Sequence, residues 1–483
     1  MSPADVLVGI DIGTSSVKVV VTDLAGVLID QSSEPYPTHV DADGSGGEQD
    51  AGVWWETLCR VARPLLGGRR VSAVAVTSQG PTLVPLTEEG RPAGPALTWM
   101  DRRAGEQAVR LAELVPDSRN GADPFFGTAK LAWLREERPE IAGRTARVVA
   151  ANGAIIAWLG GDYCLDVSTA SLMQGFDDAA GRFDARLLEA DLGLEWLPAV
   201  VGCTEVVGRV DEDAARQTGI TAGAAIVAGG IDSVGSALEA GALAPGGQLV
   251  DMSGFSSVTI LPVPRGTRVA GMIHVQHAVP DVDLLITAQV TAGGAVDWVN
   301  GRIGAGRDLR DQSLLEARPR PSAITVVPSL AGERTPTWNA AARGIIDGVG
   351  LNTEPEDLML ATLEGNALAM ARDVDLLREA GFDVARVLST GGGARSALWR
   401  QIKADVLGVP VDRPEAGHGA ARGAAYLAGM ALGEIDVDRL SQLALDVTSS
   451  CEPDADLHAA YAARRTWFER VAQLNAERGQ TSV

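Results

Sequence analysis

Two short apolar runs open the chain, and a polar turn separates them. Residues 6–10 and 17–21 are rich in valine and isoleucine, and glycine, threonine and serine lie between them. Runs of this kind joined by such a turn predict a β-hairpin. The pattern then predicts a strand at 27–30, a helix over 53–66 and a strand at 71–77.

The opening pattern returns halfway along the chain. Residues 248–252 and 258–262 predict two strands, with a serine- and glycine-containing turn at 253–257. The two hairpins read VGIDIGTSSVKVVV and LVDMSGFSSVTIL. This weak internal repeat predicts two homologous domains, each beginning with a hairpin. The boundary is placed where alanine, glycine and proline cluster, which gives domains of 1–242 and 243–483.

Strand-to-helix switches recur elsewhere in the sequence. Residues 225–228 predict a strand that leads through two glycines into a helix of small residues. A strand at 386–389 is likewise followed by glycines and a helix, and helical spacing dominates 105–159 and 458–474. Such switches are typical of open α/β sheets, in which ligands bind where strands give way to helices.

Composition narrows the possible partners. The 483 residues have 46% hydrophobic and 22% charged side chains, as globular proteins of two or three domains do. The net charge of -22 disfavours nucleic acid and anionic membrane surfaces as partners, but backbone N–H groups and a metal ion can still hold a phosphate. The four cysteines are scattered and the five histidines have no metal-ligand spacing, so we expect no disulfide framework, no zinc site and a reducing cytoplasm. Neither a signal peptide nor a membrane-spanning run is expected.

The first turn has the residue types that hold a phosphate. Gly13 allows a tight turn, and Thr14 and Ser15 offer hydroxyl and N–H groups to phosphate oxygens. Asp11, at the strand end, can hold Mg²⁺ directly or through water, and Lys18 adds positive charge. An ordinary hairpin with a polar turn is the alternative. The second turn, with Gly254 and Ser256, favours the phosphate interpretation because it repeats the first.

Asp232 follows two glycines at a strand-to-helix switch. Phosphoryl transfer to a hydroxyl requires a group that accepts the proton and orients the oxygen, and a carboxylate at this position suits that role. A helix N-cap is the alternative interpretation, because aspartate is a preferred N-cap residue. The sequence leaves both open.

Two further segments are candidates for ligand contact. Gly391, Gly392 and Gly393 follow a strand and would let a flat ring or a phosphate approach the backbone, with Arg395 nearby; a plain flexible turn is the alternative. The segment 99–103 combines an aromatic, a carboxylate and arginines, a set typical of polyol sites.

In that segment, Trp99, Asp101 and Arg102 are the candidate substrate contacts. The alternative is a surface ion pair beside core tryptophans. For the separate Trp54-Trp55 pair, we expect Trp55 in the core.

Taken in order, these segments resemble the FGGY carbohydrate kinases and, within that family, the xylulokinase-like members. The similarity covers nearly the whole chain and is carried by GIDIGTSSVK, GEQD followed by WW, TWMDRR, AGGIDS, GERTP, RGIIDGV and STGGGARSALWRQIKADVLGVPV. It implies an α/β fold of two actin-like, ribonuclease H-like domains, with ATP and a sugar in a central cleft. It also implies that the last helix packs back on the first domain.

The resemblance implies roles for single residues. Asp232 would be the base, and Asp11 would lie beside the metal and the transferring phosphoryl group. The glycines at 391–393 would line the adenosine pocket, and Asp101 would contact substrate hydroxyls.

The sequence departs from the xylulokinase pattern at three places. Ser78 and Gln79 stand where those kinases have Met-His against the ketose, which changes the hydrogen bonds offered to substrate. Phe255 replaces a threonine in the second turn, and Asn152 lies where the family has a Lys-Asp-Tyr stretch.

The sequence therefore predicts an ATP- and Mg²⁺-dependent kinase that phosphorylates a primary hydroxyl of a small sugar, with a pentulose such as xylulose first among the candidates. Alternatives are another ketose or polyol (ribulose, erythritol, glycerol or gluconate) and a non-catalytic actin-like protein that binds ATP or sugar. A homodimer is expected from family likeness alone.

Overall fold

The computed structural model describes residues 5–40, 46–121, 123–415, 417, 419–444 and 446–480. Residues 41–45 of the polar loop and His418 lie outside this range. Within it, the predicted hairpins, strands and helices are present, although most extend by a few residues beyond the expected bounds. One strand, β9 (Arg147–Ala150), interrupts the stretch that was predicted to be helical.

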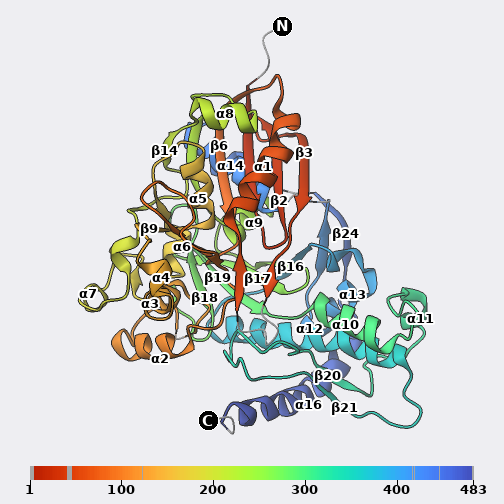
Figure 1. Cartoon of the computed structure of the whole chain (residues 1–483). Coiled ribbons are helices and arrows are strands. Elements are labelled where there is room, and N and C mark those ends of the chain that lie inside the picture. The colour runs from red at the N-terminus through yellow and green to blue at the C-terminus, as the bar shows by residue number, and fades with distance from the viewer. Residues whose placement is uncertain are drawn as a thin grey trace.

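A six-stranded sheet forms the centre of the first domain (Figure 1). Its strands, in spatial order, are β14 (Val206–Arg209), β15 (Ala225–Ile231), β6 (Arg70–Ser78), β1 (Asp5–Ile12), β2 (Ser16–Asp23) and β3 (Leu28–Pro35). The β1–β2 hairpin is antiparallel, whereas β1, β6 and β15 run parallel.

A seven-stranded sheet forms the centre of the second domain. Its strands, in order, are β18 (Ile273–Gln276), β19 (Val282–Gln289), β17 (Ser257–Pro264), β16 (Gln248–Ser253), β22 (Arg386–Thr390), β23 (Val411–Pro414) and β24 (Val447–Cys451). The series β19-β17-β16-β22-β23 has the same sequence of antiparallel and parallel pairings as β3-β2-β1-β6-β15. The internal repeat seen in the sequence is thus a repeat of topology.

Side chains along β1 point alternately to the two faces of the first sheet, and each face is covered by helices. Val8 and Ile10 face a core that includes Trp54 and Leu58 of α1 (Ala51–Leu66), because alternate side chains of a strand point to opposite faces. Leu7 faces α9 (Asp232–Glu239) and α14 (Ala420–Leu432) on the other side. Trp54 is the fully buried member of the tryptophan pair. The expectation of a core Trp55 is met only in part, because Trp55 packs against the same core but is partly exposed and donates its indole N–H to Gln217.

Helices cover one face of the second sheet, and its other face packs toward the first domain. The covering helices are α10 (Gly293–Ile303), α12 (Pro355–Glu379), α13 (Ala397–Leu407) and α16 (Ala455–Gln480). Tyr461 and Phe468 of α16 belong to this second-domain core. The prediction that the last helix packs on the first domain is therefore wrong.

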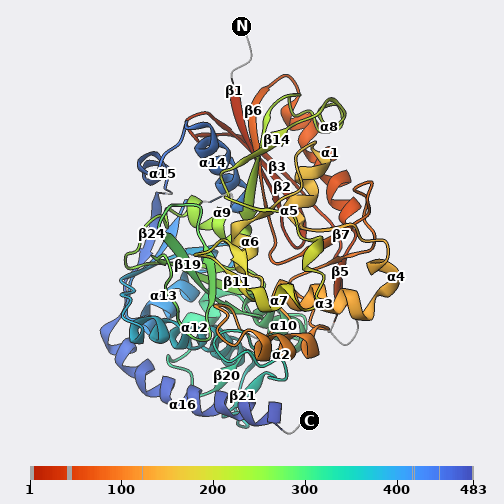
Figure 2. The same cartoon turned by 90° about the vertical axis from the view of Figure 1, so that its left-hand side faces the viewer.

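The helix that returns to the first domain is α14. It lies against β1 and α9, and α15 (Val437–Leu443) follows it there, as the blue helices beside α9 in Figure 2 show. Gly423 of α14 crosses Gly235 of α9 so closely that backbone touches backbone. Small residues are needed here because any side chain would force the two helices apart.

The remaining elements are insertions and connections. A five-stranded sheet contains β4 (His39–Val40), β5 (Gly47–Gln49), β8 (Ala96–Leu97), β7 (Leu83–Leu86) and β9, and α2 (Gly105–Leu114), α3 (Gly127–Glu137) and α4 (Pro139–Ala142) accompany it. The other short elements are α5 (Ala151–Trp158), β10 (Leu165–Asp166), α6 (Val167–Ser171), β11 (Phe176–Asp177), β12 (Arg182–Phe183), α7 (Ala185–Leu188), β13 (Val200–Val201), α8 (Glu212–Thr218), α11 (Gln312–Glu316), β20 (Thr325–Val327) and β21 (Ile345–Asp347).

Gly423→Ala is expected to lower the free energy of unfolding by about 1–3 kcal/mol, the usual range for overpacking a close contact. A Cβ at this position would lie 1.9 Å from the carbonyl oxygen of Gly235. Urea denaturation measures the change. Gly301→Ala, in α10, is the matched control: its Cβ would meet nothing within 4 Å, so that variant is expected to be neutral or slightly stabilising. Equal stability of the two variants would contradict the close packing of α9 on α14.

Candidate active site

A cavity of about 580 Å³ lies between the two domains. Both hairpin turns, the start of α9 and the end of β22 contribute to its lining, so it joins elements far apart in the chain. The predicted site residues that line it are Thr14, Lys18, Trp99, Asp232, Gly254, Ser256, Gly391, Gly392 and Arg395.

The first turn is held from behind by polar side chains. The Tyr36 hydroxyl donates to the carbonyl of Gly13, and the Thr38 hydroxyl and the Gln49 amide each donate to the carbonyl of Thr14 at 2.7 Å. On the cavity side, the Trp99 indole N–H donates to Thr14 Oγ1 at 2.9 Å. Gly13 and Ser15 shape the turn without lining the cavity. These bonds fix the turn in place before any ligand binds.

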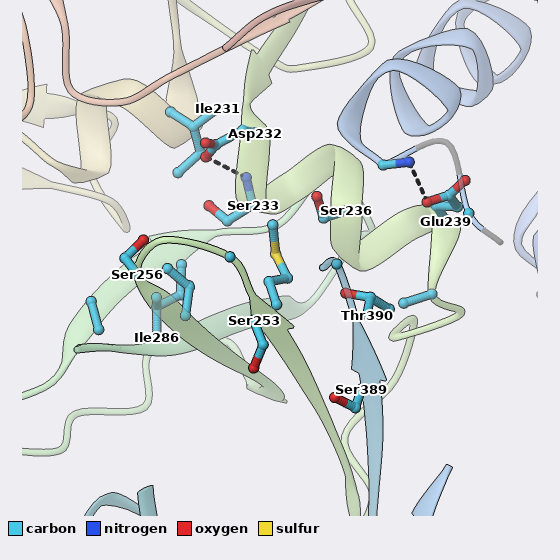
Figure 3. Close-up of a pocket in the computed structure, with 18 of the residues that line it drawn as sticks. Ile231, Asp232, Ser233, Ser236, Glu239, Ser253, Ser256, Ile286, Ser389 and Thr390 are labelled. Atoms are coloured by element: carbon cyan, nitrogen blue, oxygen red, sulfur yellow. Dashed lines mark hydrogen bonds between the residues drawn. The ribbon is translucent and has the colours of Figure 1, made fainter. Parts of the chain in front are cut away.

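Asp232 is placed by a glycine bulge at the end of β15. Gly229 has φ +69°, and a Cβ there would lie 1.8 Å from the carbonyl oxygen of Val76. The register of β15 on β6 shifts between Val227 and Gly230, and α9 begins two residues later with Asp232. Figure 3 shows Asp232 at the start of α9, with its carboxylate accepting from the Ser233 amide at 2.7 Å. Asp232 is the first residue of the helix and Ile231 is its N-cap.

Asp11 and Asp232 lie at the same edge of the sheet, because β1 and β15 both run parallel to β6 and end beside it. Desolvation raises the pKa of Asp232 to about 7, and the charge of Asp11 adds to the rise. Desolvation also raises the pKa of Asp11 to about 6, against the hydrogen bond from Thr77 and the charge of Lys18. A carboxylate with a pKa near 7 suits proton transfer at neutral pH.

The second turn presents Gly254 and Ser256 to the cavity and turns Phe255 away. The amides of Ala292 and Gly294, at the start of α10, donate to the carbonyl of Phe255 at 2.8 and 2.9 Å. The Phe255 ring is 70% exposed and lies over Gly294, where a Cβ would come within 2.7 Å of it. The second turn therefore lacks the hydroxyl that a threonine would supply, but Phe255 does not line the cavity.

A buried ion pair that the sequence pattern did not predict lies beneath this turn. Lys403 of α13 pairs with Asp251 of β16, and its ammonium also donates to Ser253 Oγ at 2.6 Å. The hydroxyls of Ser257 and Ser389 donate to the same carboxylate at 2.9 and 2.7 Å. The internal repeat could have drawn attention to Asp251, because it lies near the end of the first strand of the second hairpin, as Asp11 does in the first.

The glycines after β22 divide into two kinds. Gly391 and Gly392 line the cavity with Arg395. Gly391 has φ +80°, and a Cβ there would lie 2.6 Å from the carbonyl oxygen of Ser253. Gly393 lies away from the cavity, packed on the Trp399 ring and Ser253. Its predicted contact with nucleotide does not follow from this geometry.

Ser78 and Gln79 are buried and turned toward other protein groups. Ser78 Oγ accepts from the backbone N–H of Asn152 at 3.1 Å, and the Gln79 side chain donates to Gln49 Oε1 at 2.6 Å. Neither lines the cavity. Gln79 Oε1 is buried without a partner among the described residues. Contact of Ser78 and Gln79 with substrate stays a prediction.

Asp101 and Arg102 are engaged in separate ion pairs that are largely shielded from solvent. Asp101 is held by Arg103, and Arg102 makes a two-pronged contact with Asp123 at 2.7 and 2.8 Å. Neither lines the cavity, whereas Trp99 from the same segment does. The alternative of an ion pair describes their geometry, although Asp101 is buried and Arg102 is partly buried rather than fully on the surface. A direct role for Asp101 in substrate binding stays a prediction.

The residues at the first turn fit a magnesium ion. Asp11 is partly buried, offers a hard oxygen donor, and uses Oδ1 to accept from Thr77 Oγ1 at 3.1 Å. Magnesium is commonly bound by one or two carboxylates with water and substrate phosphates completing its shell. No cluster of three His, Cys, Asp or Glu side chains suited to a metal was found in the described part of the chain. In that same part, no helix is both long and apolar enough to span a bilayer.

Comparison with known proteins matches both halves of the chain to one family. Residues 6–238 match the N-terminal domain, and residues 254–432 the C-terminal domain, of the FGGY family of carbohydrate kinases.

Individual relatives agree over nearly the full length. The chain is 30% identical to the xylulose kinase of Escherichia coli (strain K12), covering 96% of this chain and 98% of that protein. It is 28% identical to the gluconokinase of Bacillus subtilis (strain 168), covering 89% and 88%. A crystal structure described as a xyloylose kinase from Brucella ovis superposes with a TM-score of 0.86 at 26% identity, covering 96% of this chain and 98% of that one.

Proposed function

The chain belongs to the FGGY family of carbohydrate kinases, and we propose that it transfers the γ-phosphoryl group of ATP to a primary hydroxyl of a small sugar, a pentulose such as xylulose first among the candidates. One observation carries the proposal: Asp232 and both glycine-bearing turns line a single cavity. A cytoplasmic enzyme would have access to ATP, and all four cysteines are free, as a reducing compartment requires.

In the proposed mechanism, the sugar hydroxyl lies beside Asp232, which accepts its proton as the oxygen attacks phosphorus. Thr14 on one turn and Ser256 on the other hydrogen-bond the oxygens of the transferring group. Gly391 and Gly392 leave room for the adenosine end of the nucleotide. A magnesium ion held by Asp11 would neutralise charge on the phosphates. Closure of the two domains over the substrates would exclude water, which would otherwise compete as acceptor.

The substrate assignment is tested by ADP release in a coupled assay over ketoses, polyols and sugar acids. We expect ADP release that depends on both Mg²⁺ and an added sugar, with a pentulose giving the highest kcat/KM. Release of ADP that is independent of every acceptor would contradict a sugar-kinase function.

The pH dependence follows from Asp232. Because its pKa is raised to about 7, a proton binds it well above the range of an ordinary aspartate, and the base form is lost as pH falls through 7. We expect kcat/KM for the sugar to fall about tenfold per pH unit below that point and to level off above it. Initial rates from pH 5.5 to 8.5 measure this, with circular dichroism to verify that the fold persists. A flat profile would remove Asp232 as the titrating base.

A further inference from the structure

An arginine whose guanidinium has no hydrogen-bond acceptor among the described residues lines the central cavity. Arg334, from the loop after β20 in the second domain, is 7% exposed and lines the cavity that contains Asp232. Within the described residues its guanidinium has no hydrogen-bond acceptor, and its Nε is buried without a partner. The carboxylate of Asp123, which is near it, is already occupied by Arg102.

Arg334 is held by aromatic rings of the other domain. Its Cζ lies 4.3 Å from the ring centroid of Trp99 and 4.7 Å from that of Phe125. Cation–π contacts of this kind orient the guanidinium but leave its N–H groups free to donate in the plane of the guanidinium itself. Trp99 in turn donates to Thr14 Oγ1, so the aromatic support of the arginine is itself fixed to the first turn.

The surroundings of Arg334 disfavour the positive charge of its guanidinium. Desolvation lowers the pKa of Arg334 to about 9, and the charge of Arg102 acts in the same direction. A second buried cation, Lys130, donates to the carbonyl of Phe125 at 2.6 Å and offers no acceptor. Burying a cation without a partner is strongly unfavourable, so such a group in a binding cavity indicates a ligand that supplies the acceptor.

We propose that Arg334 is the second domain's contribution to the sugar site, where its guanidinium donates to an oxygen acceptor, a keto carbonyl or a carboxylate, that adjoins the hydroxylated chain of the substrate. The inference rests on the proposed kinase function and narrows its substrates to ketoses and sugar acids over simple polyols. Because Arg334 comes from one domain and its aromatic supports from the other, bound sugar also bridges the two domains.

The test uses Arg334→Met, which keeps the apolar stem and removes the donors. D-Xylulose, D-gluconate and xylitol serve as a ketose, a sugar acid and a polyol that lacks both acceptors. Losing hydrogen bonds to a charged donor is expected to raise KM about 10- to 100-fold for whichever acceptor-bearing sugar the wild type prefers. KM for xylitol and KM for ATP should change little. Arg334→Lys should recover part of the affinity, because it restores a cation but not the planar fork.

Arg310→Met is the matched control, since Arg310 is exposed and pairs with Asp308 on the surface of the second domain. An equal rise of KM for all three sugars, or a rise for ATP, would overturn the proposal, as would a wild type that prefers xylitol. Calorimetric binding of the sugars to wild type and Arg334→Met tests the same contact without turnover. If the wild type binds an acceptor-bearing sugar tightly and the variant does not, while neither releases ADP, Arg334 stands and the kinase function fails.

Discussion

Asp232→Asn is expected to lower kcat by about 10²–10⁴-fold, the usual contribution of a general base, while ATP still binds. Asparagine keeps the size of the side chain and its bond to the Ser233 amide, but it cannot accept the hydroxyl proton. ADP release at saturating sugar measures turnover, and calorimetry measures nucleotide affinity.

Asp213→Asn provides the control for this variant. Asp213 also lies in the first turn of a helix, α8, but it is exposed and pairs with Arg216 outside the cavity. Its replacement is expected to leave turnover unchanged. Near-normal turnover in Asp232→Asn would exclude Asp232 as the base, whatever the result at Asp213.

Lys403→Met is expected to lower the free energy of unfolding by about 3–5 kcal/mol, because it leaves a buried carboxylate without its counter-charge. Asp251 is fully buried and Lys403 is 3% exposed. Desolvation acts to raise the pKa of Asp251, but the charge and hydrogen bond of Lys403 and the nearby serine hydroxyls outweigh it and hold the pKa below its ordinary value. Without the lysine, desolvation dominates and the carboxyl takes up a proton.

Chemical denaturation followed by circular dichroism measures the effect. The double variant Asp251→Leu/Lys403→Met should recover much of the lost stability, since replacing both partners by apolar groups removes the unpaired charge. The double variant is also expected to bind ATP less well than wild type, because Ser253 beside the second turn loses both its partners. A single variant as stable as wild type would mean that the pair contributes nothing to the fold.

Local patterns predicted the parts of the fold that depend on neighbours in the sequence. The two hairpins, the glycine-led start of α9 and the position of Asp232 follow from strand periodicity and from residues that allow a tight turn. The internal repeat predicted in addition that the chain has two domains of similar topology, because homologous segments adopt similar folds.

Local sequence patterns did not predict which elements pack against one another in the folded protein. The sequence of α14 reads as a helix but does not say which sheet it covers, and the last helix was assigned to the wrong domain for that reason. The sequence around Asp101 and Arg102 is the same whether these side chains bind a sugar or form ion pairs within the protein. Their ion pairs with Arg103 and Asp123 are seen only in the structure. Arg334 belongs to the GERTP segment, but nothing in the sequence predicted that its side chain lines the cavity.

The return of α14 to the first sheet has a consequence for motion. The polypeptide passes between the domains three times: from α9 to β16, from β23 to α14 and from α15 to β24. A single connection would leave two domains free to turn about it, whereas each added connection removes some of the relative orientations that they can reach. We therefore expect any relative movement of the two domains to follow a narrow range of directions, so that the same facing surfaces meet on each closure.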